Sequence, residues 1–127
     1  VKILYVEDTE LLREAVSEHL KLAGHEVVAA ENVKVGLQQF YMERPELGLV
    51  ITDVDLGSGI SGIEFVDQIV ANGWETNKII IVSGDPENIA KASSKGYQAL
   101  SKGDTTFTSY LLKAVEVLSR LSPAAVS

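Results

Sequence analysis

Five short aliphatic runs alternate with segments of helical periodicity along the 127 residues of this chain. The runs are rich in Val and Ile, which is typical of strands that are buried on both faces. They occupy residues 3–6, 27–30, 47–52, 78–83 and 98–101. Because parallel strands must be joined by long crossovers, usually helices, the alternation predicts a (βα)5 arrangement with helices on both faces of a parallel sheet. The expected fold class is therefore α/β.

The segments between the runs carry apolar residues every three or four positions, as amphipathic helices do. Residues that commonly begin or end helices stand at the edges of these segments. The boundaries that we predict from them are an N-cap at Thr9, a left-handed C-terminal turn at Gly24, helix ends at Pro45 and Gly73, and a start at Asp85 and Pro86 for a fourth helix that runs to about Ser94. The last and longest apolar stripe runs from Phe107 to Leu121.

The length of the chain fits one domain, which we place at residues 1–121, with 122–127 as a tail or the start of a linker. The chain has 11 Lys and Arg residues against 18 Asp and Glu residues, a net charge of -7 at pH 7. This charge repels a nucleic-acid backbone, so direct nucleic-acid binding is not expected. The absence of cysteine excludes disulfides and thiolate nucleophiles. No run is long enough to cross a bilayer and no leader opens the chain, so we expect a cytoplasmic protein without membrane contact.

Polar residues follow four of the five runs, where the predicted strands end. In an open parallel sheet, ligands bind outside the carboxyl ends of the strands, so these side chains are the candidates for a site. They are Glu7 and Asp8 after the first run, Asp53 and Asp55 after the third, Ser83 at the end of the fourth, and Lys102 after the fifth. Several carboxylates in one crevice raise each other's pKa unless a cation neutralises them, and an all-oxygen site of this kind suits Mg²⁺. We therefore predict a magnesium site.

Asp53 is the best placed nucleophile, because it lies in the middle of the acidic set at the end of the expected central strand. A carboxylate beside Mg²⁺ can attack phosphorus in line, since the metal draws charge from the transferring group. Lys102 would offset charge on the phosphoryl oxygens, and the hydroxyl of Ser83 could hydrogen-bond one of them. The residues thus indicate phosphoryl transfer to Asp53.

The motifs around these residues, in their order and at their strand ends, resemble the receiver domain of two-component response regulators, including single-domain chemotaxis regulators. The motifs are Ile3-Leu4-Tyr5-Val6-Glu7-Asp8, Val50-Ile51-Thr52-Asp53, Ile81-Val82-Ser83-Gly84 and Ser101-Lys102. The resemblance covers about residues 2–121 and implies a flavodoxin-like sheet with the strand order 2-1-3-4-5. It also implies a signalling switch whose only catalysis is self-directed phosphotransfer and autodephosphorylation.

The resemblance assigns a role to each acidic candidate. Asp53 would take a phosphoryl group from the phosphohistidine of a histidine kinase or a histidine phosphotransfer protein. Asp8 and Asp53 would ligate Mg²⁺ together with the backbone carbonyl of Asp55, and Glu7 would assist through water.

The resemblance also implies how the signal would leave the site. Ser83 and Lys102 would contact the phosphoryl group, and movement of Ser83 towards it would carry a conformational change to an unknown downstream protein or fused output domain. The family usually makes its contacts on the fourth and fifth helices, here around Ile89, Ala90, Tyr110 and Leu111.

The sequence departs from the family's pattern near the lysine. Gly103 stands where a proline is usual, and Ala99 stands where an aromatic residue is usual. Tyr97 lies two residues from that aromatic position, on the same side of a strand but at a different depth. Nineteen positions separate Ser83 from Lys102, which is shorter than is typical, so the fourth helix or its loops should be shortened.

Two hypotheses from other functional classes remain. One is a receiver-like docking module that works without phosphorylation. The other is a nucleotide-binding enzyme fragment, because Gly57-Ser58-Gly59-Ile60-Ser61-Gly62 is a literal G-x-G-x-x-G between a strand and a helix. These glycines do not follow the strand directly, and the acidic residues before them would repel pyrophosphate, which favours a loop with glycines at turn positions. Asp53-Val54-Asp55 also resembles the Asp-x-Asp of haloacid dehalogenase-type phosphatases, although in that family the motif belongs to the first strand.

Overall fold

The computed structural model describes residues 1–57, 59–103 and 105–120. The predicted tail at 122–127, the end of the last stripe at Leu121 and Ser58 of the glycine loop lie outside these residues. The elements are β1 Lys2–Val6, α1 Glu10–Leu22, β2 Glu26–Ala30, α2 Val33–Glu43, β3 Leu47–Asp53, α3 Gly62–Ala71, η1 Thr76–Lys78, β4 Ile79–Ser83, α4 Pro86–Ser94, β5 Gln98–Ser101 and α5 Phe107–Arg120. Within the described ranges, no helix is both long and apolar enough to cross a membrane.

The five strands form one parallel sheet in the order β2-β1-β3-β4-β5, which confirms the flavodoxin-like fold class. The chain places β2 on one side of β1 and then crosses over to place β3 on the other side. The loops that leave the carboxyl ends of β1 and β3 therefore diverge, and folds of this kind bind their ligands at that point.

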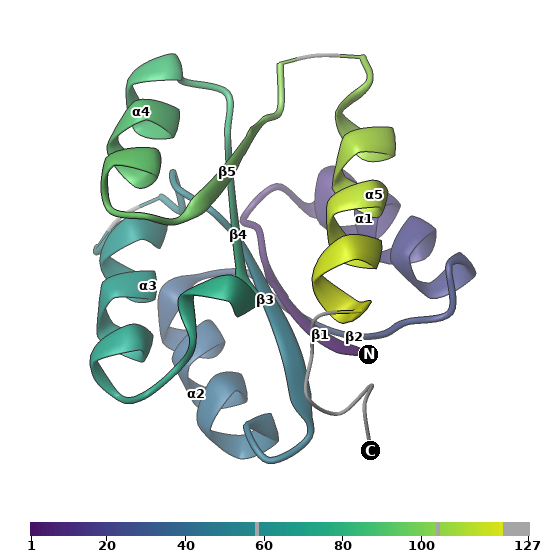
Figure 1. Ribbon diagram of the computed structural model, residues 1–127, viewed down its shortest axis with the longest axis horizontal. Coiled ribbons are helices and arrows are strands. Elements are labelled where there is room, and N and C mark those ends of the chain that lie inside the picture. Colours follow the sequence, from purple (N-terminus) through teal and green to yellow (C-terminus); the bar gives the residue numbers. More distant parts are fainter. Residues whose placement is uncertain (58, 104, 121–127) are drawn as a thin grey trace.

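Helices cover both faces of the sheet, with α1 and α5 on one face and α2, α3 and α4 on the other (Figure 1). Side chains along a strand alternate between the faces, so β1 contributes to two separate apolar cores. Ile3 and Tyr5 pack with residues of α1 and α5, while Leu4 and Val6 pack with residues of α2 and α3. The sheet is buried on both faces, as the aliphatic runs predict.

Most of the predicted helix boundaries are confirmed. Gly24 follows α1 with a φ of 95°, and Gly73 follows α3 with a φ of 97°, a conformation that glycine adopts without steric cost. The side chain of Asp85 accepts a hydrogen bond from the backbone N–H of Glu87 and so caps α4. Thr9 occupies the N-cap position of α1, but its side chain makes no capping hydrogen bond.

Two local expectations are wrong. Lys78, expected in the fourth strand, ends the short 3-10 helix η1, and β4 begins at Ile79. Leu111, expected near an exposed contact surface, is fully buried among the core residues beneath α5, because the apolar stripe of α5 turns it towards the sheet. Its neighbour Tyr110 is 59% exposed and remains a surface residue.

Candidate functional site

Three acidic side chains from distant parts of the sequence meet at the carboxyl ends of β1 and β3. The two strands are paired, with Val6 opposite Thr52, so the residues that follow Val6 lie beside the end of β3. One carboxylate oxygen from each of Glu7, Asp8 and Asp53 lies within 4.8 Å of the others. Glu7 and Asp53 are buried, whereas Asp8 is exposed and borders the solvent. An all-oxygen set of this kind fits a hard divalent cation.

Lys102 lies at the end of β5 and reaches back to this acidic set. Its Nζ donates a hydrogen bond to Oδ2 of Asp53 at 2.7 Å and another to Oε1 of Glu7 at 3.1 Å. Its backbone N–H donates to the carbonyl oxygen of Ser83 at 2.9 Å, which fixes the start of the loop after β5 against the end of β4. Burial lowers the pKa of Lys102, but the contacts with Asp53 and Glu7 outweigh it, so the pKa is raised and the ammonium group stays charged.

The surroundings of Glu7 disfavour the ionisation of its carboxyl group. Burial, followed by the nearby charge of Asp53, raises the pKa of Glu7 from 4.5 to about 7, although Lys102 and a backbone hydrogen bond from Thr9 act in the opposite direction. The hydroxyl of Tyr5 donates to Oε1 of Glu7 at 3.5 Å. These neighbours fix the position of the Glu7 carboxyl at the base of the site.

This shifted pKa predicts how stability depends on pH when a chelator is present. A carboxyl group with a higher pKa in the folded chain favours folding below pH 4.5, and it loses this contribution as the pH rises through about 7. The free energy of unfolding of Glu7→Gln, relative to that of the unmodified protein, should therefore increase as the pH rises across this range. Urea denaturation at about pH 5 and about pH 8 measures the difference. A difference that stays constant with pH would contradict the assignment.

Contacts with neighbouring residues fix the backbone and the side chain of Asp53. Oδ1 of its side chain accepts a hydrogen bond from the N–H of Val54 at 2.8 Å, and its carbonyl oxygen accepts one from the Thr52 hydroxyl at 2.9 Å. At the start of α3, Gly62 lies against the same carbonyl, so that a Cβ there would be 1.8 Å from the oxygen. The N–H of Gly62 donates to the carbonyl of Val54 at 2.8 Å. Sequence reasoning missed this positioning contact, because Gly62 was assigned only to a turn-rich loop.

Two predicted site residues are not part of the cluster of three carboxylates. Ser83 ends β4 and is fully buried, and its Oγ accepts hydrogen bonds from the N–H of Asp85 at 3.0 Å and from Nδ2 of Asn88 at 3.4 Å. In the part of the chain that the structure describes, no hydrogen bond joins its hydroxyl to Glu7, Asp8 or Asp53. The side chain of Asp55 is exposed and lies outside the cluster of three carboxylates.

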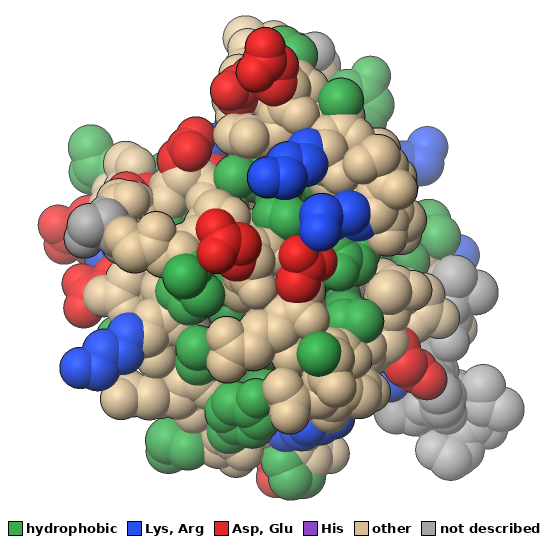
Figure 2. Space-filling model, turned by 90° about the vertical axis from the view of Figure 1, so that its left-hand side faces the viewer, with side chains coloured by type: hydrophobic (Ala, Val, Ile, Leu, Met, Phe, Trp, Pro, Cys, Tyr) green, Lys and Arg blue, Asp and Glu red, His purple; other side chains and the backbone are tan. Residues whose placement is uncertain are grey.

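Tyr97 has a structural contact far from the three carboxylates. Its ring is 8% exposed, and its hydroxyl donates a 2.5 Å hydrogen bond to Oδ1 of Asp67 on α3. Lys95 pairs with the other oxygen of the same carboxylate at 2.9 Å. Figure 2 views the molecule from the side of α2, α3 and α4, where acidic and basic side chains lie next to each other. Tyr97 therefore joins the residue just before β5 to α3, and Ala99 leaves the usual aromatic position without a ring.

Tyr97→Phe should lower the free energy of unfolding by about 1 kcal/mol, because it removes a partly buried hydrogen bond to a carboxylate. Phosphoryl uptake should be unchanged, since among the described residues no hydrogen bond links Tyr97 to the carboxylates at the ends of β1 and β3. Urea denaturation and phosphoryl labelling measure the two effects. Tyr110→Phe on the exposed face of α5 is the matched control and should change neither. A loss of labelling in Tyr97→Phe alone would show that Tyr97 belongs to the switch.

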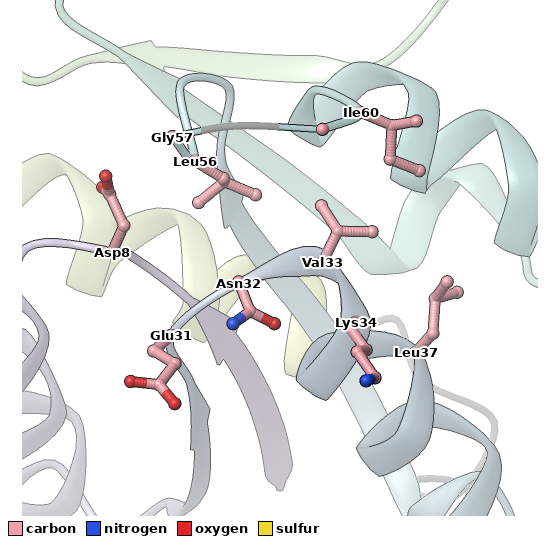
Figure 3. A pocket seen from close by; sticks show the side chains of 10 residues that line it. Asp8, Glu31, Asn32, Val33, Lys34, Leu37, Leu56, Gly57 and Ile60 are labelled. Carbon is pink, nitrogen blue, oxygen red and sulfur yellow. The ribbon is translucent and has the colours of Figure 1, made fainter.

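A cavity of about 710 Å³ opens beside Asp8, between the loop after β3 and the start of α2 (Figure 3). Its lining combines the carboxylates of Asp8 and Glu31 with apolar side chains such as Leu56 and with Gly57 of the glycine loop. Lys34 also lines the cavity, but the two carboxylates outnumber its single positive charge and so disfavour a pyrophosphate there. The N–H of Gly62, which a nucleotide-binding loop would present to phosphate, instead bonds to Val54. These observations weigh against the nucleotide-binding hypothesis.

Comparisons with known proteins agree with this arrangement. The family model of the response regulator receiver domain matches residues 3–104. A receiver domain protein from Clostridium thermocellum is 25% identical, with a TM-score of 0.82 over 94% of each chain. The response regulator protein TrrA from Thermotoga maritima, in complex with Mg²⁺ and beryllofluoride, is 28% identical, with a TM-score of 0.79 over 92% of this chain and 97% of that chain.

Similarity also extends to part of a longer protein. A cyclic di-GMP phosphodiesterase from Thermotoga maritima is 36% identical over 89 residues. The match takes in 70% of this chain but only 23% of the phosphodiesterase. The chain thus corresponds to less than a quarter of that curated relative.

Proposed function

Because this chain belongs to the family of response regulator receiver domains, which are phosphoacceptor modules of two-component signalling, we propose that Asp53 is its phosphoacceptor. Receiver domains take their phosphoryl groups from histidine kinases. The observation that carries the assignment is the meeting of Asp53 with Glu7, Asp8 and the ammonium group of Lys102. Of the three carboxylates, only that of Asp53 is both placed at the end of the central strand β3 and paired with the lysine.

The same carboxylates fit Mg²⁺. We propose that Asp8 and Asp53 hold it with the backbone carbonyl of Asp55, and that Glu7 contributes through water. The arrangement supports this because the donor set is all oxygen, as Mg²⁺ prefers, and because exposed Asp8 leaves a side open to water. When bound, Mg²⁺ would neutralise charge on the transferring phosphoryl group.

The chain's own residues would each do one part of the transfer. An oxygen of Asp53 attacks phosphorus, an O–P bond forms, and the N–P bond to the donor histidine breaks as its imidazole leaves. Lys102 stays charged and offsets the negative charge that the phosphoryl oxygens bring into the buried site. The Ser83 hydroxyl donates to a phosphoryl oxygen once it turns towards Asp53.

This chemistry indicates the classes of protein that the domain would interact with. The phosphoryl donor is the phosphohistidine of a histidine kinase or a histidine phosphotransfer protein. The downstream partner, which responds to the phosphorylated domain, is a separate protein or an output domain of a longer chain. The domain itself spans residues 1–121 in this proposal and works in the cytoplasm. The long phosphodiesterase relative supports attachment to an output domain, whereas TrrA, matched over 97% of its chain, supports action as a single domain.

A titration followed by backbone NMR tests the proposal. Mg²⁺ is added first and beryllofluoride second, and the shifts should cluster at Asp8, Asp53, Ser83 and Lys102. Trp74 is a poor reporter, because it packs on Phe40 and its Nε1 donates to the carbonyl of Lys78 just before the amino end of β4, whereas the site lies at the carboxyl ends of the strands. No shift with either addition would favour a docking module that works without phosphorylation. Shifts with a nucleotide that are confined to Gly57–Gly62 would favour an enzyme fragment.

A further inference from the structure

The buried hydroxyl of Ser83 is held by the first turns of α4. Its Oγ accepts one hydrogen bond from the backbone N–H of Asp85 and one from the side-chain amide of Asn88. In the ranges that the structure describes, no hydrogen bond joins this hydroxyl to Glu7, Asp8 or Asp53. A contact with a phosphoryl group on Asp53 would be new for this hydroxyl, and a turn of the Ser83 side chain to make it would alter these two bonds.

Of the five helices, α4 buries the fewest residues in the part of the chain that the structure describes. Ala92 is its only buried residue, whereas α3 buries five, among them Phe65 and Ile69. Few apolar contacts are therefore lost if the start of α4 shifts, and segments with few such contacts move at low cost in free energy. A change in the hydrogen bonds of Ser83 can thus be transmitted to α4.

The usual aromatic route for the signal is absent at the neighbouring strand. Ala99 has no ring to rotate, and the ring of Tyr97 is fixed by its hydrogen bond to Asp67. The hydrogen bonds recorded for the Ser83 side chain come from Asp85, the N-cap of α4, and from Asn88 within α4. Only one of them, from Asn88, comes from a side chain and so depends on the residue type.

We propose that Asn88 is a positioning residue: its amide holds the Ser83 hydroxyl on α4 and so sets how readily that hydroxyl turns towards a phosphoryl group on Asp53. The inference rests on the proposed function. A hydrogen bond made only in the resting conformation stabilises that conformation, and removing it shifts the population towards the other. The bond is long, so its loss should change affinity modestly, by about threefold.

The test is the affinity for beryllofluoride at saturating Mg²⁺, measured by NMR in four proteins that form a cycle: the unmodified chain, Asn88→Ala, Ser83→Ala and the double variant. Asn88→Ala should bind about threefold more tightly. Ser83→Ala should bind less tightly than the unmodified chain, and adding Asn88→Ala to it should have no further effect. Ser93→Ala, a neutral and exposed change on the same helix, is the matched control and should leave affinity unchanged.

Two results would overturn the role of Asn88. One is an unchanged or weaker affinity in Asn88→Ala, and the other is a gain of the same size in the Ser83→Ala background, since that gain would not pass through the hydroxyl. Thermal unfolding of each variant confirms that it is folded before its affinity is compared. If the unmodified chain itself binds no beryllofluoride, the proposed function fails, and this outcome is distinct from a failure confined to Asn88.

Discussion

Replacing Asp53 by asparagine is expected to abolish phosphoryl uptake while the protein stays folded. An amide oxygen is a far poorer nucleophile than a carboxylate, and loss of a nucleophile typically lowers a rate by about a thousandfold or more. The fold should persist because Lys102 keeps its contact with Glu7, and because removing one of three crowded carboxylates relieves repulsion. Incubation with Mg²⁺ and a small acyl phosphate, followed by the mass of the intact protein, measures the uptake.

Asp67→Asn is the matched control for this change. It is also an Asp to Asn substitution, but Asp67 lies on α3 in contact with Tyr97 and Lys95, outside the acidic cluster. Phosphoryl uptake should be unchanged in this variant. Uptake by Asp53→Asn at the rate of the unmodified protein would rule out Asp53 as the acceptor.

Replacing Gly62 by alanine is expected to cause the largest loss of stability. The added Cβ would lie 1.8 Å from the carbonyl oxygen of Asp53 and 2.8 Å from its carbonyl carbon, so the backbone of α3 or β3 must move. Overpacking against rigid atoms costs roughly 3 kcal/mol. Helix propensity acts in the opposite direction, because alanine is favoured over glycine in a helix by about 1 kcal/mol. A lower free energy of unfolding would therefore show that the close contact with the Asp53 carbonyl dominates, and a higher one would show that helix propensity does.

Urea denaturation measures this loss, and Gly84→Ala provides the control. A Cβ at Gly84 would meet no atom within 4 Å, and the residue does not have a positive φ. Its replacement should change the free energy of unfolding by no more than about 0.5 kcal/mol. An equal or greater stability of Gly62→Ala would show that the start of α3 does not depend on close approach to Asp53.

The repeating pattern of the chain was sufficient to predict the elements. Aliphatic runs and amphipathic stripes depend on burial, and burial leaves a period in the sequence that can be recognised. Caps such as Asp85 and turns such as Gly24 also depend on one residue and its near neighbours, so most were predicted correctly. The strand order was a different matter, because periodicity does not tell which strands pair, and it came from the resemblance to a known family.

The acidic candidates could be named because their carboxylates follow the strand ends directly. The direction in which Ser83 points could not be predicted, since it depends on hydrogen bonds from a helix that begins after it. The role of Gly62 could not be predicted, because in the sequence it looks like any glycine of a loop. Only the structure shows that the Asp53 carbonyl occupies the place of a Cβ. The place of Lys102 directly after the fifth run predicts a position at the strand ends, and in the structure it contacts Asp53 and Glu7, whereas Lys95 pairs with Asp67.

Identification of the modified residue tests the central claim most directly. The unmodified protein is incubated with Mg²⁺ and an acyl phosphate and then reduced with borohydride, which converts a phosphorylated aspartate to homoserine. Peptide mass spectrometry should find this conversion at position 53 and only when Mg²⁺ is present. Conversion at Asp8 or Asp55 instead, or uptake that does not depend on Mg²⁺, would contradict the account.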